Sequence, residues 1–275
     1  MPTFSLTAIN VGSFSIGEAD KVLWLFSREF GLTKGVAKGA RKPGAKISGK
    51  AEALCVNNLF MAKGKSLDII TQAESVETFP KLRQDLEKLT YGLYFAELTK
   101  SFGVGLEEDS SFYFEILIQY LKRLSNTKDN SSMLTLEFEL ALLNLLGFQP
   151  ELKVCVICRE PLTEYSISTF TLDIGGICCK TCSGNISRRV SEDDQSDYPS
   201  RGTFVTPLVW KYLSLASAKA DQALRGEASE NESGSENSLT PSQKGSLAQA
   251  RTVAQKYLED RAGHRMKSLD LLKSL

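Results

Sequence analysis

The sequence has almost no histidine: among its 275 residues the single imidazole is that of His264. Ser-His-Asp and Cys-His catalytic centres need an imidazole as general base, and nothing in the sequence around His264 supports one. A zinc-dependent base deaminase needs His-x-Glu and Pro-Cys-x-x-Cys motifs, and the sequence has neither. Gly64-Lys65-Ser66 resembles the end of a phosphate loop, but Leu59 stands where its first glycine belongs. These absences predict a binding protein and not an enzyme.

The sequence also lacks long apolar runs and an excess of either charge. No run reaches the ~18 apolar residues of a membrane span. Residues 1–12 have no basic head followed by an apolar segment, so a signal peptide is not expected. The charges of the 33 basic and 33 acidic residues cancel. A surface that binds nucleic acid would therefore have to be a local basic patch. We expect a cytoplasmic protein with no membrane partner.

One such basic patch is present between residues 34 and 50. This stretch contains no acid and six basic residues: Lys34, Lys38, Arg41, Lys42, Lys46 and Lys50. Four glycines and Pro43 argue against a long helix, so the charges are expected on a loop and short strand ends. Such a backbone can follow a phosphate chain, and the six residues are our candidate DNA contacts. A solvated loop without a ligand is the alternative that charge alone leaves open.

Residues 1–80 are predicted to form a small β-barrel. Short apolar runs with glycine-rich connections are typical of strands, although the run 22–30 also fits a buried helix. A five-stranded OB-type barrel suits this length. Lys63 and Lys65 add positive charge to the barrel. Phe26 and Phe30 are candidates for stacking on bases, and the alternative for both rings is a position in the core.

After residue 80 the apolar spacing becomes helical, so the expected fold class is α+β and multidomain. Leu82, Leu86, Leu89 and Leu93 would share one helical face, Tyr113 to Leu124 repeats the period, and Met133 to Leu146 is a third helix that Gly147 ends. A further helix is expected over 203–219. The expected domains are the barrel over 1–80, a helical domain over 81–150, a four-cysteine module over 151–190, more of the helical domain over 191–225, a disordered linker over 226–246 and a C-terminal helix over 247–275.

Four of the six cysteines stand in two Cys-x-x-Cys pairs separated by twenty residues. Each pair can aim two thiolates at one point, so Cys155, Cys158, Cys179 and Cys182 predict a closed, structural Zn²⁺ site with one ion per chain. Cys178 could replace Cys179, but Cys179 restores the two-residue gap. Unmetallated core or redox cysteines are the alternative.

The motifs, taken in order, resemble those of the RecO family, bacterial recombination mediators of DNA repair. The matching segments are Gly17–Asp20, Lys38–Pro43, Leu82–Leu86, Phe138–Leu140, Leu145–Phe148, Cys155–Cys158 and Gly175–Cys182, with a weaker match at Met266–Leu269. The resemblance covers residues 10–190, and the segment 226–246 looks like an insertion relative to the family.

The resemblance implies an N-terminal OB barrel, a central helical domain and a zinc-ribbon-like insertion. It also implies a nucleoid-associated protein that binds single- and double-stranded DNA and anneals complementary strands. With the partner RecR, such proteins help a recombinase displace single-strand-binding protein, whose acidic C-terminal tail docks on the helical domain. By this resemblance Lys38, Arg41 and Lys42 carry the basic motif. A zinc-stabilised protein-interaction scaffold with an incidental basic loop is the alternative function, and a nucleic-acid enzyme is the third.

Overall fold

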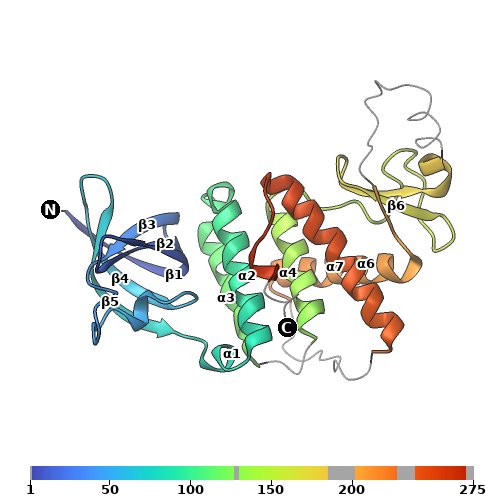
Figure 1. The fold of residues 1–275 in the computed structure, drawn as a ribbon. Coiled ribbons are helices and arrows are strands. Elements are labelled where there is room, and N and C mark those ends of the chain that lie inside the picture. Colours follow the sequence, from blue (N-terminus) through green and yellow to red (C-terminus); the bar gives the residue numbers. More distant parts are fainter. Residues whose placement is uncertain (1, 127–129, 185–201, 228–238, 271–275) are drawn as a thin grey trace. The chain divides into compact units, whose positions relative to one another are not determined.

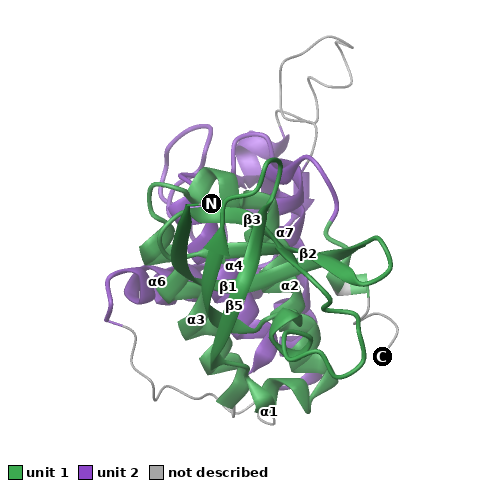
Figure 2. Cartoon of the chain, turned by 90° about the vertical axis from the view of Figure 1, so that its left-hand side faces the viewer, with its two compact units in different colours: residues 1–127, 266–275 green, residues 128–265 purple. Residues whose placement is uncertain are grey.

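The computed structural model describes residues 2–126, 130–184, 202–227 and 239–270. The chain folds into two compact units, one formed by residues 1–127 and 266–275 and the other by residues 128–265 (Figure 2). The boundary at residue 127 falls inside the segment 81–150 that the sequence assigned to a single helical domain. No helix in the described ranges is both long enough and apolar enough to cross a membrane.

The first unit begins with a five-stranded barrel (Figure 1). Its strands are β1 (Thr3–Ile16), β2 (Asp20–Ser27), β3 (Gly31–Ala37), β4 (Val56–Ala62) and β5 (Asp68–Glu77). They pair in the order β1-β2-β3-β5-β4, and β1 with β4 closes the ring. Only β3 and β5 pair in parallel, through two residue pairs, so closure on that side is short. The predicted α+β class and N-terminal barrel are confirmed.

Side chains that alternate between the two faces of each strand fill the interior of the barrel. On β2, Leu23 and Leu25 belong to the interior cluster, which puts Trp24 on the opposite face of the strand. Gly35 of β3 faces the same interior, where a Cβ would lie 2.8 Å from Met61 Cε. The barrel therefore has no spare room at this point.

The helical elements that follow the barrel strands in the described part of the first unit are α1 (Pro80–Arg83), α2 (Leu86–Phe102), η2 (Gly103–Leu106), α3 (Ser110–Asn126) and η4 (Ser268–Asp270). The single leucine face expected from Leu82 to Leu93 is wrong. Asp85 is extended and caps α2 by accepting a hydrogen bond from Lys88 N at 3.1 Å, which separates α1 from α2. Leu86 is 59% exposed, and the buried face of α2 instead carries aromatic residues such as Tyr94 and Phe95.

Helix α3 buries the residues that its spacing predicted. Tyr113, Ile116, Leu117, Tyr120, Leu121 and Leu124 are all buried. The Tyr113 ring meets Phe26 of β2 edge to face, with centroids 5.2 Å apart, and its hydroxyl lies 2.8 Å from Thr99 Oγ1 of α2. One tyrosine thus joins the barrel to both long helices of the first unit.

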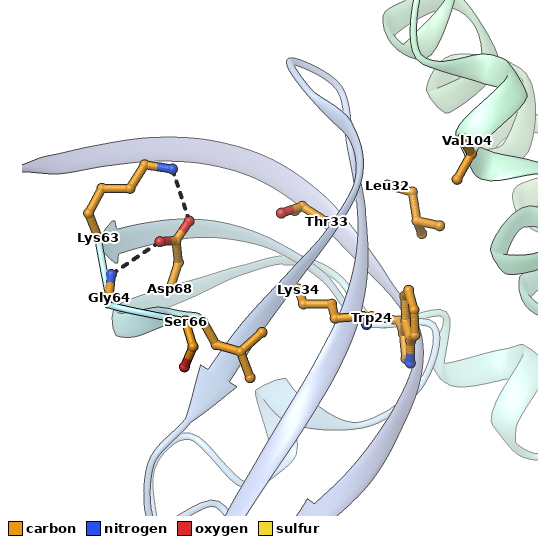
Figure 3. Close-up of a pocket in the computed structure, with 10 residues that line it drawn as sticks. Trp24, Leu32, Thr33, Lys34, Lys63, Gly64, Ser66, Asp68 and Val104 are labelled. Carbon is orange, nitrogen blue, oxygen red and sulfur yellow. Dashed lines mark hydrogen bonds and ion pairs between the residues drawn. The ribbon is translucent and has the colours of Figure 1, made fainter.

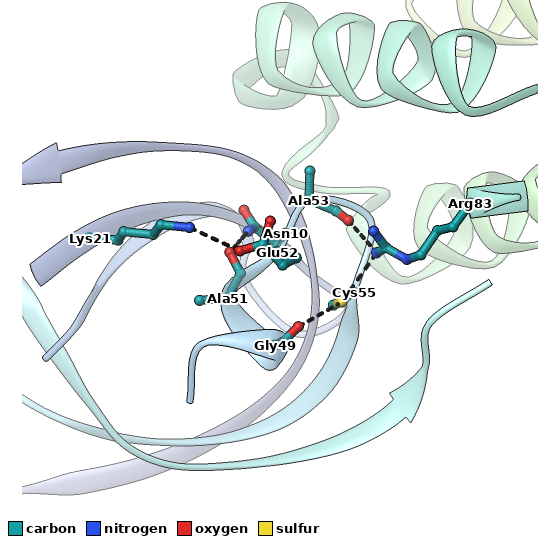
Figure 4. Close-up of polar contacts among 8 residues, drawn as sticks. All are labelled: Asn10, Lys21, Gly49, Ala51, Glu52, Ala53, Cys55 and Arg83. Carbon is teal, nitrogen blue, oxygen red and sulfur yellow. Dashed lines mark hydrogen bonds and ion pairs between the residues drawn. The ribbon is translucent and has the colours of Figure 1, made fainter. Parts of the chain in front are cut away.

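Arg83 ties α1 to the barrel (Figure 4). Its Nη2 donates to Ala53 O at 2.6 Å and to Cys55 Sγ at 3.3 Å, and its Nε donates to Thr78 O at 2.8 Å. The buried Cys55 thiol donates in turn to Gly49 O at 3.3 Å. Burial raises the pKa of Cys55, so this residue remains a neutral thiol at pH 7.

The chain returns to the first unit at its end. The backbone N–H groups of Lys267 and Ser268 donate to the two carboxylate oxygens of Glu97 on α2, at 2.9 and 2.8 Å. Met266 is fully buried beside this contact. Two N–H groups are thereby paired with one side chain from a distant part of the sequence.

Within the described ranges, the elements of the second unit include helices and a small sheet: α4 (Ser131–Leu145), β6 (Ile167–Thr171), β7 (Gly176–Cys179), β8 (Gly202–Phe204), α6 (Pro207–Leu224) and α7 (Pro241–Ala262), with residues 180–184 also helical. The sheet order is β7-β6-β8. Helix α6 starts later than the predicted 203 because residues 202–204 pair with β6. Gly147 ends α4 as predicted, with a left-handed φ of 75°.

Helix α7 differs from its predicted range at both ends. It starts at Pro241, inside the expected linker, because Thr240 forms a capping box with Gln243. It stops at Ala262, before the left-handed Gly263, and does not continue to residue 275. The remainder of the expected linker, residues 228–238, lies outside the described ranges.

Helices α4, α6 and α7 pack together around two buried carboxylates. Glu137 Oε1 lies 3.7 Å from Lys219 Nζ of α6, and Glu139 Oε1 lies 3.8 Å from Arg251 Nη2 of α7. Buried acids of this kind require a cation in reach. This pairing explains why an acid follows Phe138 in an otherwise apolar helix.

Candidate nucleic-acid interface and candidate metal centre

The six basic residues of the stretch 34–50 occupy several parts of the barrel. Lys34 lies on β3, and residues 38–48 form successive turns that lead into the short helix η1 (Gly49–Ala51). The expected absence of a long helix is thus explained by these turns. Residues 38–46 are called the basic turn below; its four cations, Lys38, Arg41, Lys42 and Lys46, are exposed, whereas Lys34 and Lys50 are half-buried.

The basic turn is held by the connection between β1 and β2. Gly39 has a left-handed φ of 68°, and its N–H donates to Asp20 Oδ1 at 2.7 Å. Arg41 N donates to Ala19 O at 2.9 Å, and Arg41 Nη1 donates to Gly17 O at 3.2 Å. The segments 17–20 and 38–43, which sequence analysis treated as separate motifs, therefore contact one another. Arg41 acts here as a support for the turn.

Three lysines remain available on the basic turn. The ammonium groups of Lys38, Lys42 and Lys46 have no hydrogen-bond or ion-pair partner within the described part of the chain. The ammonium of Lys50 instead donates to Ala73 O of β5. The sequence could not separate these roles, because all six residues carry the same charge in the same short stretch.

Sequence reasoning missed Trp24. This residue pairs with Lys34 across β2 and β3, and Lys34 Nζ lies 3.9 Å from the centroid of the indole ring. Lys100 Nζ, from α2, lies 5.1 Å from the same centroid. Trp24 lines a hollow of about 510 Å³ together with residues of β3 and of the β4–β5 connection (Figure 3). Finding this cluster requires the strand register, which the sequence alone does not provide.

The two proposed base stackers differ. Phe26 is fully buried against Tyr113, so its ring is part of the core and the stacking prediction is wrong for this residue. Phe30 is 57% exposed and meets Phe4 edge to face at 5.9 Å, so its role stays a prediction. Lys63 is exposed but paired with Asp68 at 3.1 Å. Lys65 is exposed at the same connection.

The four predicted cysteines converge in the second unit. Their Sγ atoms all lie within 4.8 Å of one another, and Cys158 Sγ is 3.9 Å from Cys179 Sγ. Zn–S bonds of ~2.3 Å in a tetrahedron would put the sulfurs ~3.8 Å apart. The donor set therefore fits a metal ion, and Cys179, not Cys178, is the residue that joins the other three.

Backbone N–H groups point into this cluster. Burial by itself would raise the pKa of Cys155, but the N–H groups of Cys158, Cys179 and Ile157 outweigh it and lower the pKa to about 6. Cys155 is therefore a thiolate at pH 7, as metal binding requires. Burial and the charge of Cys155 raise the pKa of Cys178 to about 12, which keeps this neighbour a neutral thiol.

Two glycines allow close packing around the cluster. A Cβ at Gly176 would lie 2.5 Å from Val156 Cγ1 of the first Cys-x-x-Cys pair, and a Cβ at Gly175 would lie 2.1 Å from the Tyr257 hydroxyl of α7. Arg261 of α7 donates to Leu172 O at 2.6 Å. The turn between β6 and β7, which precedes the second Cys-x-x-Cys pair, is thus packed against α7 independently of any metal.

Comparison with known proteins finds two family models that match successive segments of the chain. The family model described as Recombination protein O N terminal covers residues 1–79, and Recombination protein O C terminal covers residues 83–191. The chain is 33% identical over 232 residues to the DNA repair protein RecO of Desulforamulus reducens, covering 83% of this chain and 86% of that relative. It is 36% identical over 183 residues to the DNA repair protein RecO of Gloeobacter violaceus, covering 66% and 69%. The chain therefore belongs to the RecO family.

Proposed function

We propose that the protein is a non-enzymatic recombination mediator in DNA repair, which binds single- and double-stranded DNA and anneals complementary single strands. The relatives that carry the name DNA repair protein RecO support the repair role. The observation that carries the DNA-binding step is the basic turn, an exposed loop of the five-stranded barrel on which the ammonium groups of Lys38, Lys42 and Lys46 have no protein partner in the described ranges. His264, the single imidazole, is exposed on the surface.

The proposed mechanism is electrostatic. Ammonium groups of the basic turn bind phosphates and release counterions, which favours binding without base specificity. The Asp20–Gly39 hydrogen bond and the Arg41 contacts keep the turn in one conformation, so little conformational entropy is lost when a strand binds. Two strands held by several such contacts can meet and pair without any covalent step.

The proposed partners follow from family membership. In a cytoplasmic, nucleoid-associated setting, the protein would act with a RecR-type partner to load a recombinase onto strands coated by single-strand-binding protein. The acidic C-terminal tail of single-strand-binding protein would dock on the helical part of the chain. Domain boundaries at 80, 150, 190 and 225 remain part of this proposal, whereas the expected boundary at 246 is replaced by the start of α7 at Pro241.

We also propose that Cys155, Cys158, Cys179 and Cys182 hold one structural Zn²⁺ per chain. Four thiolates complete a tetrahedral shell and leave no position for substrate, so the ion would stabilise the loops and supply no chemistry. The convergence of the four sulfurs and the low pKa of Cys155 support this assignment.

The test replaces Lys38, Lys42 and Lys46 together by glutamine and measures binding of oligo-dT by fluorescence anisotropy over a range of salt concentrations. Three lost phosphate contacts should lower the slope of log K against log salt by about 2, at ~0.7 per contact. Lys122→Gln, at an exposed position of α3, is the control for a general loss of charge. Unchanged affinity and slope in the triple variant would reject the DNA-binding role of the turn.

A protein-interaction scaffold is a second candidate, favoured by apolar side chains that the second unit exposes. Tyr165 is 86% exposed and Phe204 is 62% exposed. Retention of single-strand-binding protein by a purified protein that binds no DNA would favour this scaffold over the mediator.

A further inference from the structure

The Trp24 ring faces an unusual arrangement of two lysines. Lys34 Nζ and Lys100 Nζ lie 3.9 and 5.1 Å from its centroid. Neither ammonium has an ion-pair partner in the described part of the chain. Two like charges this close to one ring repel each other, and an anion bound by both would reduce that repulsion. The pair is therefore a suitable seat for a phosphate.

The hollow beside the ring can accept the rest of a nucleotide (Figure 3). Its volume of about 510 Å³ is within the range of small-ligand sites, and Leu32, Leu67 and Val104 give it apolar walls. At its far end Lys63 and Asp68 neutralise each other, with Asp68 also accepting from Gly64 N at 3.2 Å. The net positive charge of the hollow is therefore concentrated at the Trp24 end.

We propose that Trp24, Lys34 and Lys100 form a nucleotide subsite for single-stranded DNA, in which the two ammonium groups bind one backbone phosphate and the adjacent base stacks on the indole. In the absence of DNA the Lys34 ammonium occupies a position over the ring. A phosphate draws this ammonium away, and the base takes its place on the accessible part of the half-buried ring. The subsite lies apart from the basic turn in sequence and adds α2, through Lys100, to the path of the strand.

This inference rests on the proposed single-strand binding, and tryptophan fluorescence can test the two separately. The chain has two tryptophans, Trp24 and Trp210. Trp210 belongs to the second unit, where its Nε1 donates to Leu152 O at 2.8 Å. A Trp210→Phe variant leaves Trp24 as the single reporter, and circular dichroism establishes that the variant is folded.

In Trp210→Phe protein, oligo-dT should quench Trp24 emission, with the same midpoint as binding measured by anisotropy. Binding without a change in emission would overturn the subsite and leave the proposed function intact. Absence of all single-strand binding would overturn both. Quenching by inorganic phosphate alone, equal to that by oligo-dT, would show an anion site and overturn the nucleotide assignment.

Variants then separate the phosphate from the base, in protein that retains Trp210. Lys34→Gln with Lys100→Gln should lower the salt slope by about 0.7, the value for one phosphate, whereas Lys122→Gln should leave it unchanged. Trp24→Leu should weaken binding roughly tenfold, and Trp24→Phe should restore most of it, because stacking needs an aromatic face. Equal affinities of the Leu and Phe variants would contradict stacking.

Discussion

The Asp20 carboxylate accepts a hydrogen bond from the Gly39 N–H at 2.7 Å, so an acid holds the most basic loop of the protein in place. Charge and geometry therefore predict opposite effects of removing this acid. By charge alone Asp20→Ala would strengthen DNA binding, but we expect several-fold weaker binding because the turn loses its anchor.

Fluorescence anisotropy with oligo-dT at one fixed salt concentration measures this effect. Glu18→Ala removes an acid from the same connection at an exposed position and should not weaken binding. Asp20→Asn keeps an acceptor oxygen and should lie close to the parent. Stronger binding by Asp20→Ala would mean that the carboxylate acts only as a charge.

The adjacent residues Cys178 and Cys179 allow a matched pair of variants that tests the metal site. Cys179→Ala removes a predicted ligand, whereas Cys178→Ala alters a buried thiol whose sulfur is not in the cluster. Metal analysis of purified protein should give about one Zn per chain in the parent and in Cys178→Ala, and much less in Cys179→Ala. The reverse pattern would exchange the roles of the two residues.

The Tyr113 hydroxyl gives a prediction about alkaline stability. Burial raises the pKa of Tyr113 above its usual value, so the folded state favours the neutral phenol. The resulting contribution to the free energy of unfolding is complete below pH ~10, the pKa of tyrosine in the unfolded chain, and is lost as the pH rises above that value.

Tyr113→Phe should cost about 1 kcal/mol at pH 7, through loss of the hydrogen bond with Thr99. Above pH ~10 the difference should shrink, because phenylalanine cannot ionise. Urea unfolding at a series of pH values measures both. A difference that stays constant with pH would show that Tyr113 does not contribute to alkaline unfolding.

A side chain at Gly35 would require Met61 and Ile70 to shift. A Cβ there would meet Met61 Cε at 2.8 Å and Ile70 Cγ1 at 3.1 Å inside the closed barrel, so Gly35→Ala should destabilise the protein by about 1–3 kcal/mol in urea unfolding. Gly49→Ala is the control, because a Cβ at Gly49 has no heavy atom within 4 Å. Equal stability of the two variants would mean that the barrel repacks without cost.

Local patterns predicted those features that depend on nearby residues. The buried face of α3, the stop at Gly147 and the four-cysteine cluster all follow from spacing of a few residues. The leucine face around Leu86 failed because one residue, Asp85, interrupts the helix and changes its register. Periodicity counts apolar residues but does not detect an extended capping residue within the pattern.

The sequence predicted the candidate DNA site as a basic stretch, but it did not predict the role of each residue in that stretch. The sequence does not reveal that Arg41 and Lys50 are used within the barrel, nor that Lys34 and Lys100 both approach the Trp24 ring. These facts depend on strand register and on residues tens of positions apart. Their physical origin is tertiary packing, which no short motif encodes.

The contact of Glu97 with Lys267 and Ser268 makes the second unit an insertion within the first. During synthesis, α2 therefore waits for its last partner until the whole of the second unit has left the ribosome. A chain truncated after Gly263 would keep all four cysteines of the metal cluster and would instead lose the closing contact of the barrel-bearing unit. The far end of the sequence thus contributes to the stability of the unit that contains its beginning.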